Sequence, residues 1–556
     1  MIRIISVNRV SNWVKQEGSF IFWLTLLNLT YIENFYANNH GRYLLLEIIK
    51  HGTLRVFAPV IIFDILILLI FGHWKRLCRA VKIFFLTVNV FSFIVDMFTI
   101  FYYGIPLDRA MLEVALTTNF REGSEFLEMY IFNLNLWGLL VAVAVAMILL
   151  RYLYSMLLER KNGLAVLCSA FMIMFVISVC SKSLTKGNPQ KSIAVFRLIS
   201  IFQGIHRDRA DLREMENGIP DEIILTRNES KIPHIVFILG ESTNRNHMSL
   251  YGYSLPTNPY LLKRQHEGGM YIFNDVISPH AHTMIVLEKL FTFYRYGDEK
   301  NWFNYANLFS ILNSAGYRTF WLSNQESAII GVVGKFFAGK CSVSRFTILK
   351  DHGDDVITYD EEILPILDEI LSSSSSEKNF YVLHLMGTHM SYHYRYPENF
   401  SKFTFADEGG FDGIDNSQKA VRAEYDNAVL YNDFVVNEII RRFEAENAIV
   451  IYVSDHGEEI YDKMNFSGHE EIIDSSSMIE IPMIIWLSER FMEAFPDIER
   501  RIADSVNRPF MTDDMIHVIL DIAGIETSDY KPQLSVINEA YDVSRERIAS
   551  GRHYEK

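Results

Sequence analysis

The chain has 556 residues and a formal net charge of −15, and 49% of its residues are hydrophobic. This length is enough for two or three domains, and the negative charge argues against nucleic acid as a partner. The apolar residues concentrate in the first third of the chain, which indicates a membrane region followed by a soluble one.

Five stretches of the first third are apolar enough to cross a bilayer as helices, which takes ~20 residues each. They cover residues 20–36, 54–73, 81–103, 129–149 and 164–180. Lys and Arg gather before the first stretch, between the second and third, and between the fourth and fifth. The positive-inside rule then puts the N-terminus in the cytoplasm and everything after the fifth stretch on the outer face. We therefore expect residues 1–181 to form a transmembrane domain with five helices.

The loop between the third and fourth stretches carries acids at helical spacing, namely Glu122, Glu125 and Glu128. They would lie along one face of a short helix at the membrane surface. That face is either simply solvated or a site for the cationic headgroup of a lipid substrate. Residues 182–231 are polar, and we expect a linker with interfacial helices there.

From residue 232 to 556, short apolar runs alternate with helical patterns. The runs are continuous and rich in β-branched or aromatic residues, as expected of strands that are covered on both faces. They cover residues 235–239, 318–322, 380–385, 448–453 and 483–487. This alternation predicts an α/β doubly wound domain with a mostly parallel sheet.

Ligands of such sheets bind beyond the C-terminal ends of the strands, where this chain places metal-ligand side chains. Glu241 follows the first predicted strand, and the pair Asp455 and His456 follows a later one. Carboxylate oxygens and an imidazole nitrogen suit zinc, or else manganese, if the two strands are neighbours. Taken singly, each group could equally belong to an ordinary strand-end turn.

Further histidines follow other predicted strands and loops: His384, His389 and His469. A lone histidine in a loop is more often structural than catalytic. Thr283 lies just before an apolar helical run, where a helix N-terminus and a nearby zinc ion would lower the pKa of its hydroxyl. It is thus a candidate nucleophile, and its structural alternative is a plain N-cap threonine.

Several motifs stand in a specific order: "GESTNRNHMSLYGY", "SPHAHT", "HLMGTHMSYHYRYP", "EYDNAVLYNDFVVNEII", "VSDHGEE" and "TDDMIHVILDIAGIETS". With the five apolar stretches, they resemble the lipopolysaccharide phosphoethanolamine transferases of Gram-negative inner membranes. Those enzymes belong to the alkaline phosphatase and sulfatase superfamily. The resemblance implies a multi-pass inner-membrane protein with an alkaline phosphatase/sulfatase-like catalytic domain in the periplasm.

The resemblance also implies roles for individual residues. Glu241, Asp455, His456 and Thr283 match the zinc ligands of the family, and Thr283 matches its nucleophile. His389 and His469 match histidines that hold the phosphoryl group or a second zinc. Asn119 and Glu122 match the headgroup-binding loop. The roles of His280 and His282, which flank Ala281, stay unassigned.

These implied roles support a double displacement. Thr283 attacks phosphatidylethanolamine, diacylglycerol leaves, and a group of the lipopolysaccharide core or of lipid A then attacks the phosphothreonine. Periplasmic glucans are an alternative acceptor. Unlike many members, the soluble part cannot form internal disulfides, because Cys341 is its one cysteine.

Other readings compete with a transferase. A phosphodiesterase or sulfatase-type hydrolase would use water as the acceptor. The stretch "CSVSR" at residues 341–345 is similar to the sulfatase motif Cys-x-Pro-x-Arg, but it lacks the proline and lies well past Glu241 and Thr283. A membrane sensor without activity would not need Glu241, Thr283, Asp455 and His456 together.

Overall fold

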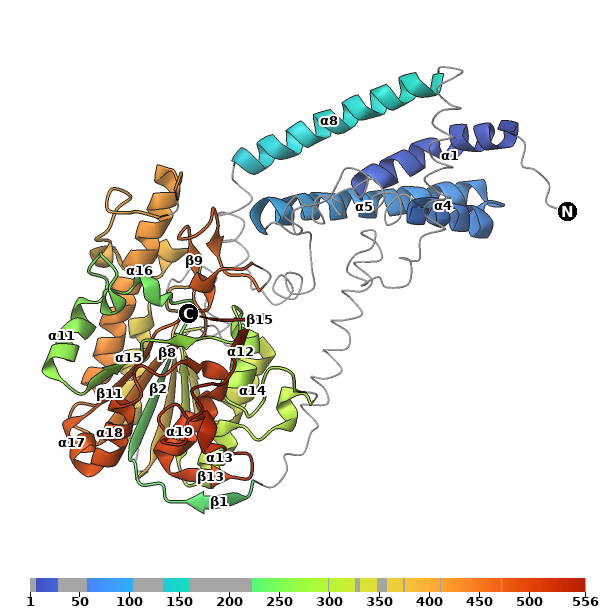
Figure 1. Ribbon diagram of the computed structural model, residues 1–556. Coiled ribbons are helices and arrows are strands. Elements are labelled where there is room, and N and C mark those ends of the chain that lie inside the picture. The colour runs from blue at the N-terminus through green and yellow to red at the C-terminus, as the bar shows by residue number, and fades with distance from the viewer. Residues whose placement is uncertain are drawn as a thin grey trace. The chain divides into compact units, whose positions relative to one another are not determined.

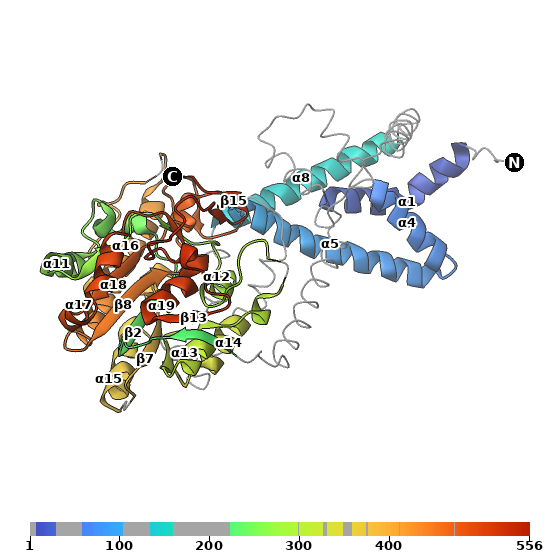
Figure 2. The same ribbon diagram turned by 60° about the horizontal axis from the view of Figure 1, so that its bottom comes forward.

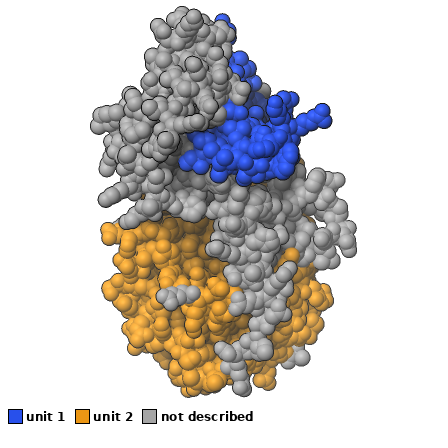
Figure 3. Space-filling model, turned by 90° about the vertical axis from the view of Figure 1, so that its right-hand side faces the viewer, with its two compact units in different colours: residues 1–118, 126–214 blue, residues 119–125, 215–556 orange. Residues whose placement is uncertain are grey.

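The structure is a computed structural model of the chain. It describes residues 7–28, 58–103, 134–159, 223–298, 300–325, 331–347, 358–373, 376–410, 412–471 and 473–555. These residues divide into two compact units, which Figure 3 colours separately. The described helices before residue 160 belong to the first unit, and the residues from 223 onward belong to the second.

Apolar helices make up the described part of the first unit (Figure 1). They are α1 (Val7–Leu27), α4 (Ala58–Phe71), α5 (Lys75–Tyr103) and α8 (Leu134–Glu159). Lys82 of α5 pairs with Asp64 of α4 at 2.6 Å (Nζ to Oδ1) and also with Glu17 of α1, so one cluster of charges joins three helices.

Among the described helices, the segment Lys75–Thr99 of α5 is long and apolar enough to cross a membrane, judged by length and composition. Shorter apolar segments occur at Glu17–Leu27, Val60–Phe71 and Leu140–Leu149. The fifth predicted span, residues 164–180, lies outside the described residues. The count of five spans therefore stays a prediction.

A seven-stranded sheet forms the centre of the second unit, with the strand order β3-β11-β8-β2-β7-β5-β6. Its strands are β2 (His234–Gly240), β3 (Met270–Ile272), β5 (Arg318–Ser323), β6 (Val343–Phe346), β7 (Asn379–His384), β8 (Ala448–Ser454) and β11 (Met483–Leu487). All five strands expected from the sequence are present. The sheet is mostly parallel, because only β11 runs antiparallel to its neighbours β8 and β3.

Helices cover both faces of this sheet (Figure 1 and Figure 2). They are α11 (Pro259–Glu267), α12 (Thr283–Leu290), α13 (Leu308–Ser314), α14 (Gly331–Lys340), α15 (Ile363–Ser373), α16 (Asn416–Arg441), α17 (Glu489–Ala494), α18 (Pro496–Ala503) and α19 (Met515–Ala523). Successive side chains of a strand point to opposite faces. Val236 and Ile238 of β2 thus join the core that includes Val429 of α16. Phe237 packs on the other face against Phe291, with ring centroids 5.8 Å apart.

Four short strand pairs surround the sheet. They are β1 (Leu225–Asn228) with β13 (Ile525–Thr527), β4 (Val276–Ile277) with β12 (Phe510–Met511), β9 (Glu459–Ile460) with β10 (Ser467–Gly468), and β14 (Ile548–Ala549) with β15 (Arg552–His553). Strand β1 falls in the last part of the segment expected to be a linker. The β9–β10 and β14–β15 hairpins both contribute to the site described below.

The register of the central strands positions the site. Strand β2 lies between β7 and β8 and is parallel to both, and Gly240 of β2 pairs with Ser454 of β8. Glu241 and Asp455, the next residue of each strand, therefore leave the sheet side by side. This is the neighbour relation that a shared metal site requires.

Candidate active site

Four of the predicted site residues converge at the carboxyl ends of β2 and β8. Thr283 Oγ1 lies 3.2 Å from Glu241 Oε2 and 3.3 Å from His456 Nε2. His456 Nε2 lies 3.3 Å from Glu241 Oε1 and 3.4 Å from Asp455 Oδ2. Glu241, Asp455 and His456 are buried, and their ligand atoms all lie within 4.8 Å of one another.

Thr283 does not cap helix α12. The N-cap is His282, and Thr283 is the first helical residue, so the structural alternative of an N-cap threonine is wrong. At this position the hydroxyl faces the two side chains above, while the backbone enters the helix. Because a helix N-terminus carries a partial positive charge, it favours a developing negative charge on this oxygen.

Neighbouring side chains hold the two carboxylates in place. Ser242 donates from its hydroxyl to Glu241 Oε1 at 2.9 Å and from its backbone N–H to Asp455 Oδ1 at 3.0 Å. It does so in a left-handed conformation, with φ of 57°, which is uncommon for a residue other than glycine. Gln325 Nε2 donates to Glu241 Oε2 at 3.3 Å. Backbone strain such as that of Ser242 is typical of functional sites.

Gly387 brings a third strand end close to Glu241. Its φ is 54°, and a Cβ added there would meet the backbone O and N of Glu241 at 2.7 and 2.9 Å. Thr388, the next residue, donates from its backbone N–H to the same carbonyl oxygen at 3.0 Å. A side chain at position 387 would therefore displace a predicted metal ligand.

The charges of the site are strongly coupled. Burial disfavours the charged form of His456, but Asp455 and Glu241 outweigh it and raise the pKa of His456 to about 10. Burial and then the charge of Glu241 raise the pKa of Asp455 to about 7. Burial would raise the pKa of Glu241 as well, but the hydrogen bond and charge of His456 hold it well below its ordinary value. In the absence of metal, protons on His456 and Asp455 therefore compensate part of the negative charge that a bound cation would neutralise.

The donor set fits zinc. Two carboxylates, one imidazole and one hydroxyl offer four ligand atoms, and Asp455 Oδ2 is buried with no hydrogen-bond partner among the described residues. In a tetrahedral site with bonds of about 2.1 Å, ligand atoms are about 3.4 Å apart. The separations of 3.2 to 3.4 Å agree with this spacing. Because His456 Nδ1 lies 2.9 Å from the carbonyl oxygen of Gly457, Nε2 stays directed at the other ligands.

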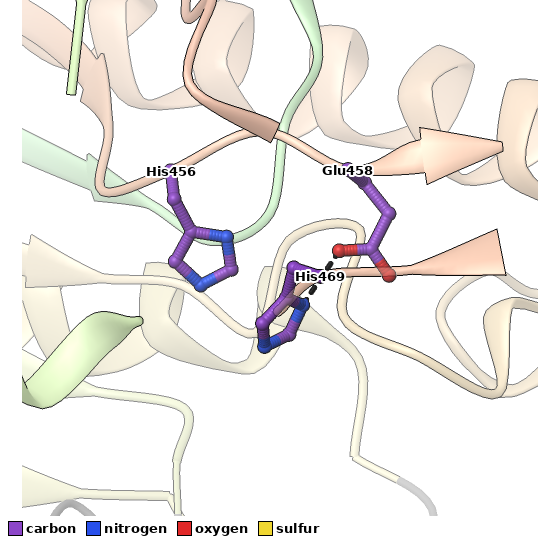
Figure 4. Close-up of side chains that lie close together, drawn as sticks. All are labelled: His456, Glu458 and His469. Carbon is purple, nitrogen blue, oxygen red and sulfur yellow. Dashed lines mark hydrogen bonds and ion pairs between the residues drawn. The ribbon is translucent and has the colours of Figure 1, made fainter. Parts of the chain in front are cut away.

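A second group adjoins the first through His456 (Figure 4). The ligand atoms of His456, Glu458 and His469 also lie within 4.8 Å of one another. His469 Nδ1 lies 2.7 Å from Glu458 Oε2, and the rings of His456 and His469 are 4.2 Å apart. His389 is next in line, with its ring 6.5 Å from that of His469.

The imidazole of His389 is neutral, and hydrogen bonds fix the loop that carries it. Burial lowers its pKa to about 4, and its Nδ1 has no hydrogen-bond partner in the described parts of the chain. Its carbonyl oxygen and that of Met390 accept hydrogen bonds from the buried Arg395 at 3.2 and 3.1 Å (from Nε). Arg395 thus fixes the loop, while burial keeps the imidazole of His389 neutral.

The remaining predicted histidines differ in their surroundings. His280 Nδ1 lies 3.2 Å from Glu471 Oε2. His282 is half-buried beside the site, where burial and then the charges of His469 and His456 lower its pKa to about 4. His384 is buried in the sheet, contacts Ser323 Oγ at 3.2 Å and packs edge-on against Trp321, which is a structural environment.

Two further sets of residues complete the comparison with the sequence. Asn119 and Glu122 lie outside the described residues. Cys341 precedes β6, at the amino end of a parallel strand, whereas the site lies at the carboxyl ends. Burial raises the pKa of the Cys341 thiol, which makes it a poor nucleophile.

Sequence reasoning missed two contributors, Glu458 and Gln325. Glu458 was visible within "SDHGEE", three residues after Asp455, but its pairing with His469 depends on the β9–β10 hairpin. Tyr392 also donates to its Oε1 at 2.7 Å. Gln325 follows β5, and a neutral amide is not a residue type that predicts a metal or phosphate site.

Comparison with known proteins agrees with this fold. The Sulfatase family model matches residues 233–525, more than half of the chain, so the second unit belongs to the sulfatase class of folds. A second model, Phosphoethanolamine transferase EptA/EptB, matches residues 61–187. The zinc complex of the periplasmic domain of EptC from Escherichia coli is 30% identical and covers 58% of this chain and 91% of its own, with a TM-score of 0.54.

Two longer relatives extend the match toward the N-terminus. "Phosphoethanolamine transferase EptC" of Escherichia coli K12 is 28% identical over 82% of this chain and 81% of its own length. The integral membrane protein lipooligosaccharide phosphoethanolamine transferase A of Neisseria meningitidis shares the fold at 20% identity, with a TM-score of 0.64 over 93% of this chain and 98% of its own. The chain therefore belongs to the phosphoethanolamine transferase family, as the motifs predicted.

Proposed function

We propose that this protein transfers phosphoethanolamine from phosphatidylethanolamine to lipopolysaccharide, at a core sugar or at lipid A, through a phosphothreonine at Thr283. The observation that carries the proposal is the approach of Thr283 Oγ1 to within 3.4 Å of both Glu241 and His456 at a helix N-terminus. A structural threonine would not need two buried titratable side chains around its hydroxyl.

Zinc is the proposed cofactor, held by Glu241, Asp455, His456 and Thr283. When bound, it would supply Lewis acidity that favours the alkoxide form of Thr283 and withdraws charge from a phosphoryl oxygen. Ser242 and Gln325 would keep Glu241 oriented by their hydrogen bonds.

In the first step, Thr283 Oγ1 attacks the phosphorus of the donor. A phosphorus–oxygen bond to Thr283 forms, the bond to diacylglycerol breaks, and the diacylglycerol oxygen takes up a proton. In the second step, a hydroxyl or phosphate oxygen of the acceptor attacks the same phosphorus, the bond between phosphorus and Thr283 Oγ1 breaks, and Thr283 regains its proton. The phosphoethanolamine is conserved throughout.

His389 and His469 are the proposed partners of the phosphoryl oxygens. The ring of His469 lies beside that of His456, His389 lies next to His469, and His389 has an unpartnered buried nitrogen among the described residues. His469, oriented by Glu458, is the better placed of the two to exchange a proton with a leaving or attacking oxygen. Asn119 and Glu122 are proposed to contact the ethanolamine headgroup, on the strength of the motif resemblance.

Membrane attachment suits this reaction, because donor and acceptor are both lipids whose reacting groups meet at one surface. We propose a multi-pass inner-membrane protein with five spans in residues 1–181, a linker over 182–231 and a periplasmic catalytic domain over 232–556. Helix α5, which is long and apolar enough to span a bilayer, supports the anchor.

Replacing Thr283 tests the proposal. In cells that express Thr283→Ala, we expect no phosphoethanolamine increment in the mass spectrum of lipopolysaccharide, a loss of at least about 10³-fold in transfer. Thr283→Ser keeps the hydroxyl and should retain measurable transfer. Mass spectrometry of the intact wild-type protein, incubated with donor alone, should show one phosphoethanolamine adduct that Thr283→Ala lacks.

Three outcomes would contradict parts of the proposal. Full transfer by Thr283→Ala would exclude the threonine as nucleophile. Release of free phosphoethanolamine without labelled lipopolysaccharide would favour a hydrolase. An increment on a periplasmic glucan, with lipopolysaccharide unchanged, would reassign the acceptor.

A further inference from the structure

A cavity beside the nucleophile's segment is built by a part of the chain that the proposed chemistry does not use. It is lined by Ala281, by the loop of residues 473–479 and by residues 549–554, which include the β14–β15 hairpin. Ala281 precedes Thr283 by two residues, so their Cα atoms are at most about 7 Å apart. A ligand in this cavity would therefore lie next to the reacting centre.

The hairpin segment is fastened to the rest of the unit by bonds along its length. Arg547 binds Asp275 through two hydrogen bonds of 2.8 and 3.1 Å. The backbone N–H of Ser550 donates to the carbonyl of Pro279 at 2.8 Å, and the hydroxyl of Tyr554 donates to Glu480 at 2.6 Å. The hairpin is thus a fixed wall of the cavity.

Glu471 connects the β14–β15 hairpin to the segment that precedes Thr283. Its Oε1 accepts the backbone N–H of Ala281 at 2.7 Å, and its Oε2 lies 3.2 Å from His280 Nδ1. The hydroxyl of Ser550 also donates to it. The same carboxylate therefore contacts the residues before the nucleophile and the hairpin, so the cavity keeps a defined position relative to Thr283.

The chemistry of the lining indicates its ligand. The serine hydroxyls at positions 475 and 550 already donate to Glu459 and Glu471, so each can accept a hydrogen bond from a ligand, and that of Ser476 accepts one from Lys463. Arg552 and His553 add basic groups at the rim, with side chains 38% and 65% exposed; Arg552 also donates to the carbonyl of Ile473 at 3.1 Å, and His553 Nδ1 lies 3.1 Å from Glu546 Oε1. The one carboxylate of the lining, Asp474, lies 3.8 Å from Arg552 and is 86% exposed. An anionic group the size of a phosphate or carboxylate, carried by a sugar that stays outside the cavity, fits this arrangement best, because the cavity volume is about 60 Å³.

We propose that this cavity is the acceptor subsite and that Arg552 binds an anionic group of the acceptor glycolipid, a sugar phosphate or a sugar carboxylate. This inference rests on the proposed function, since it assigns the second substrate of the same reaction. The subsite acts after the phosphothreonine has formed, so Arg552 affects the second half-reaction and leaves the first unchanged.

The test separates the two half-reactions in the full-length protein in detergent. With phosphatidylethanolamine alone, Arg552→Ala should form the Thr283 adduct and release diacylglycerol within about twofold of wild type. With purified lipopolysaccharide added, transfer should fall about tenfold or more, through a higher KM, because a charge-assisted hydrogen bond is lost. Arg552→Lys should recover part of the loss, and Arg500→Ala, at an exposed arginine of α18, is the matched control.

A second variant and a second substrate keep the test decisive. Ser476→Trp fills the cavity without removing Arg552 and should also slow only the acceptor step. Chemically dephosphorylated lipopolysaccharide distinguishes the anions: if wild type and Arg552→Ala then transfer at the same rate, the anion is a phosphate, and if wild type still transfers faster, the anion is a carboxylate.

Unchanged transfer by both variants, or an equal loss in both half-reactions, would overturn the subsite. A wild-type protein that forms no Thr283 adduct would instead overturn the proposed function itself.

Discussion

At the scale of single residues, protons and a metal cation compete for the same buried side chains of the site. His456, Asp455 and Glu241 share one buried space, and their pKa values respond to one another. His456, with a pKa of about 10, is an imidazolium at neutral pH in the metal-free site. An imidazole must lose its proton before it can ligate a metal ion.

Zinc affinity should therefore rise with pH. At pH 7 we expect at least about one proton to be released per zinc bound, and the apparent affinity to increase about tenfold per pH unit up to the pKa of His456. Calorimetric titration in two buffers with different ionisation enthalpies measures the proton release. His456→Gln should abolish both the release and most of the affinity, and a pH-independent affinity would show that the imidazolium is absent.

At the scale of elements, a buried charge network fixes the β9–β10 hairpin that carries Glu458 and leads to His469. His247 Nδ1 lies 2.5 Å from Asp426 of α16, and its Nε2 lies 3.1 Å from Asp462 of the hairpin turn. Arg422 of α16 also binds Asp462, at 2.6 Å. The network joins the loop after β2, helix α16 and the hairpin, all three of which border the site.

This network should make stability fall at alkaline pH. Burial disfavours the imidazolium of His247, but Asp426 and Asp462 outweigh it and raise its pKa to about 10, from an ordinary value of 6.5. Its contribution is therefore fully present below pH 6.5 and is lost as the pH rises through 10. His247→Gln should cost about 3 kcal/mol at pH 6.5, since it leaves the buried Asp426 without its cation, whereas Asp462 keeps Arg422.

Thermal unfolding of the full chain at several pH values measures this effect. The difference in Tm between wild type and His247→Gln should shrink as the pH approaches 10. His266→Gln, at an exposed histidine of α11, should match wild type throughout. A pH-independent difference in Tm would mean that His247 contributes by packing alone.

The elements of the sheet were largely predictable, and the contacts across loops were not. Runs such as Ile235–Leu239 are apolar on both faces, and this pattern identifies a buried parallel strand without any knowledge of its partners. The pairing of Glu458 with His469 depends on a hairpin of two-residue strands, which is too short to leave a periodic signal. Sequence analysis also did not predict the roles of Gln325 and of the hairpin at residues 548–553, because these roles come from tertiary contacts alone.

At the scale of the whole molecule, the charge pattern of the N-terminal region predicts the two sides of the membrane. Positive residues cluster at the start of α5, which begins at Lys75, and the chain from residue 232 onward contains the proposed catalytic residues. An odd number of spans between a cytoplasmic N-terminus and this unit would place the unit on the outer side.

Fusions of an alkaline phosphatase reporter, which is active only in the periplasm, test this topology. A fusion after Lys231 should be active, and one after Arg76 should be inactive, because the positive loop between the second and third spans stays in the cytoplasm. Equal activity of both fusions would contradict the alternation of spans. A fusion after Asp108 should be active and serves as the internal control.

The hairpin that walls the cavity lies at the end of the chain, so the cavity can form only late in synthesis. Arg547, Ser550 and Tyr554 are synthesised long after Thr283, so the predicted nucleophile at first has one side open. Until those later residues have docked on Asp275, Pro279 and Glu480, a growing chain lacks the surface proposed to receive its second substrate. Half-made copies would then accept the donor but have nowhere to pass it on.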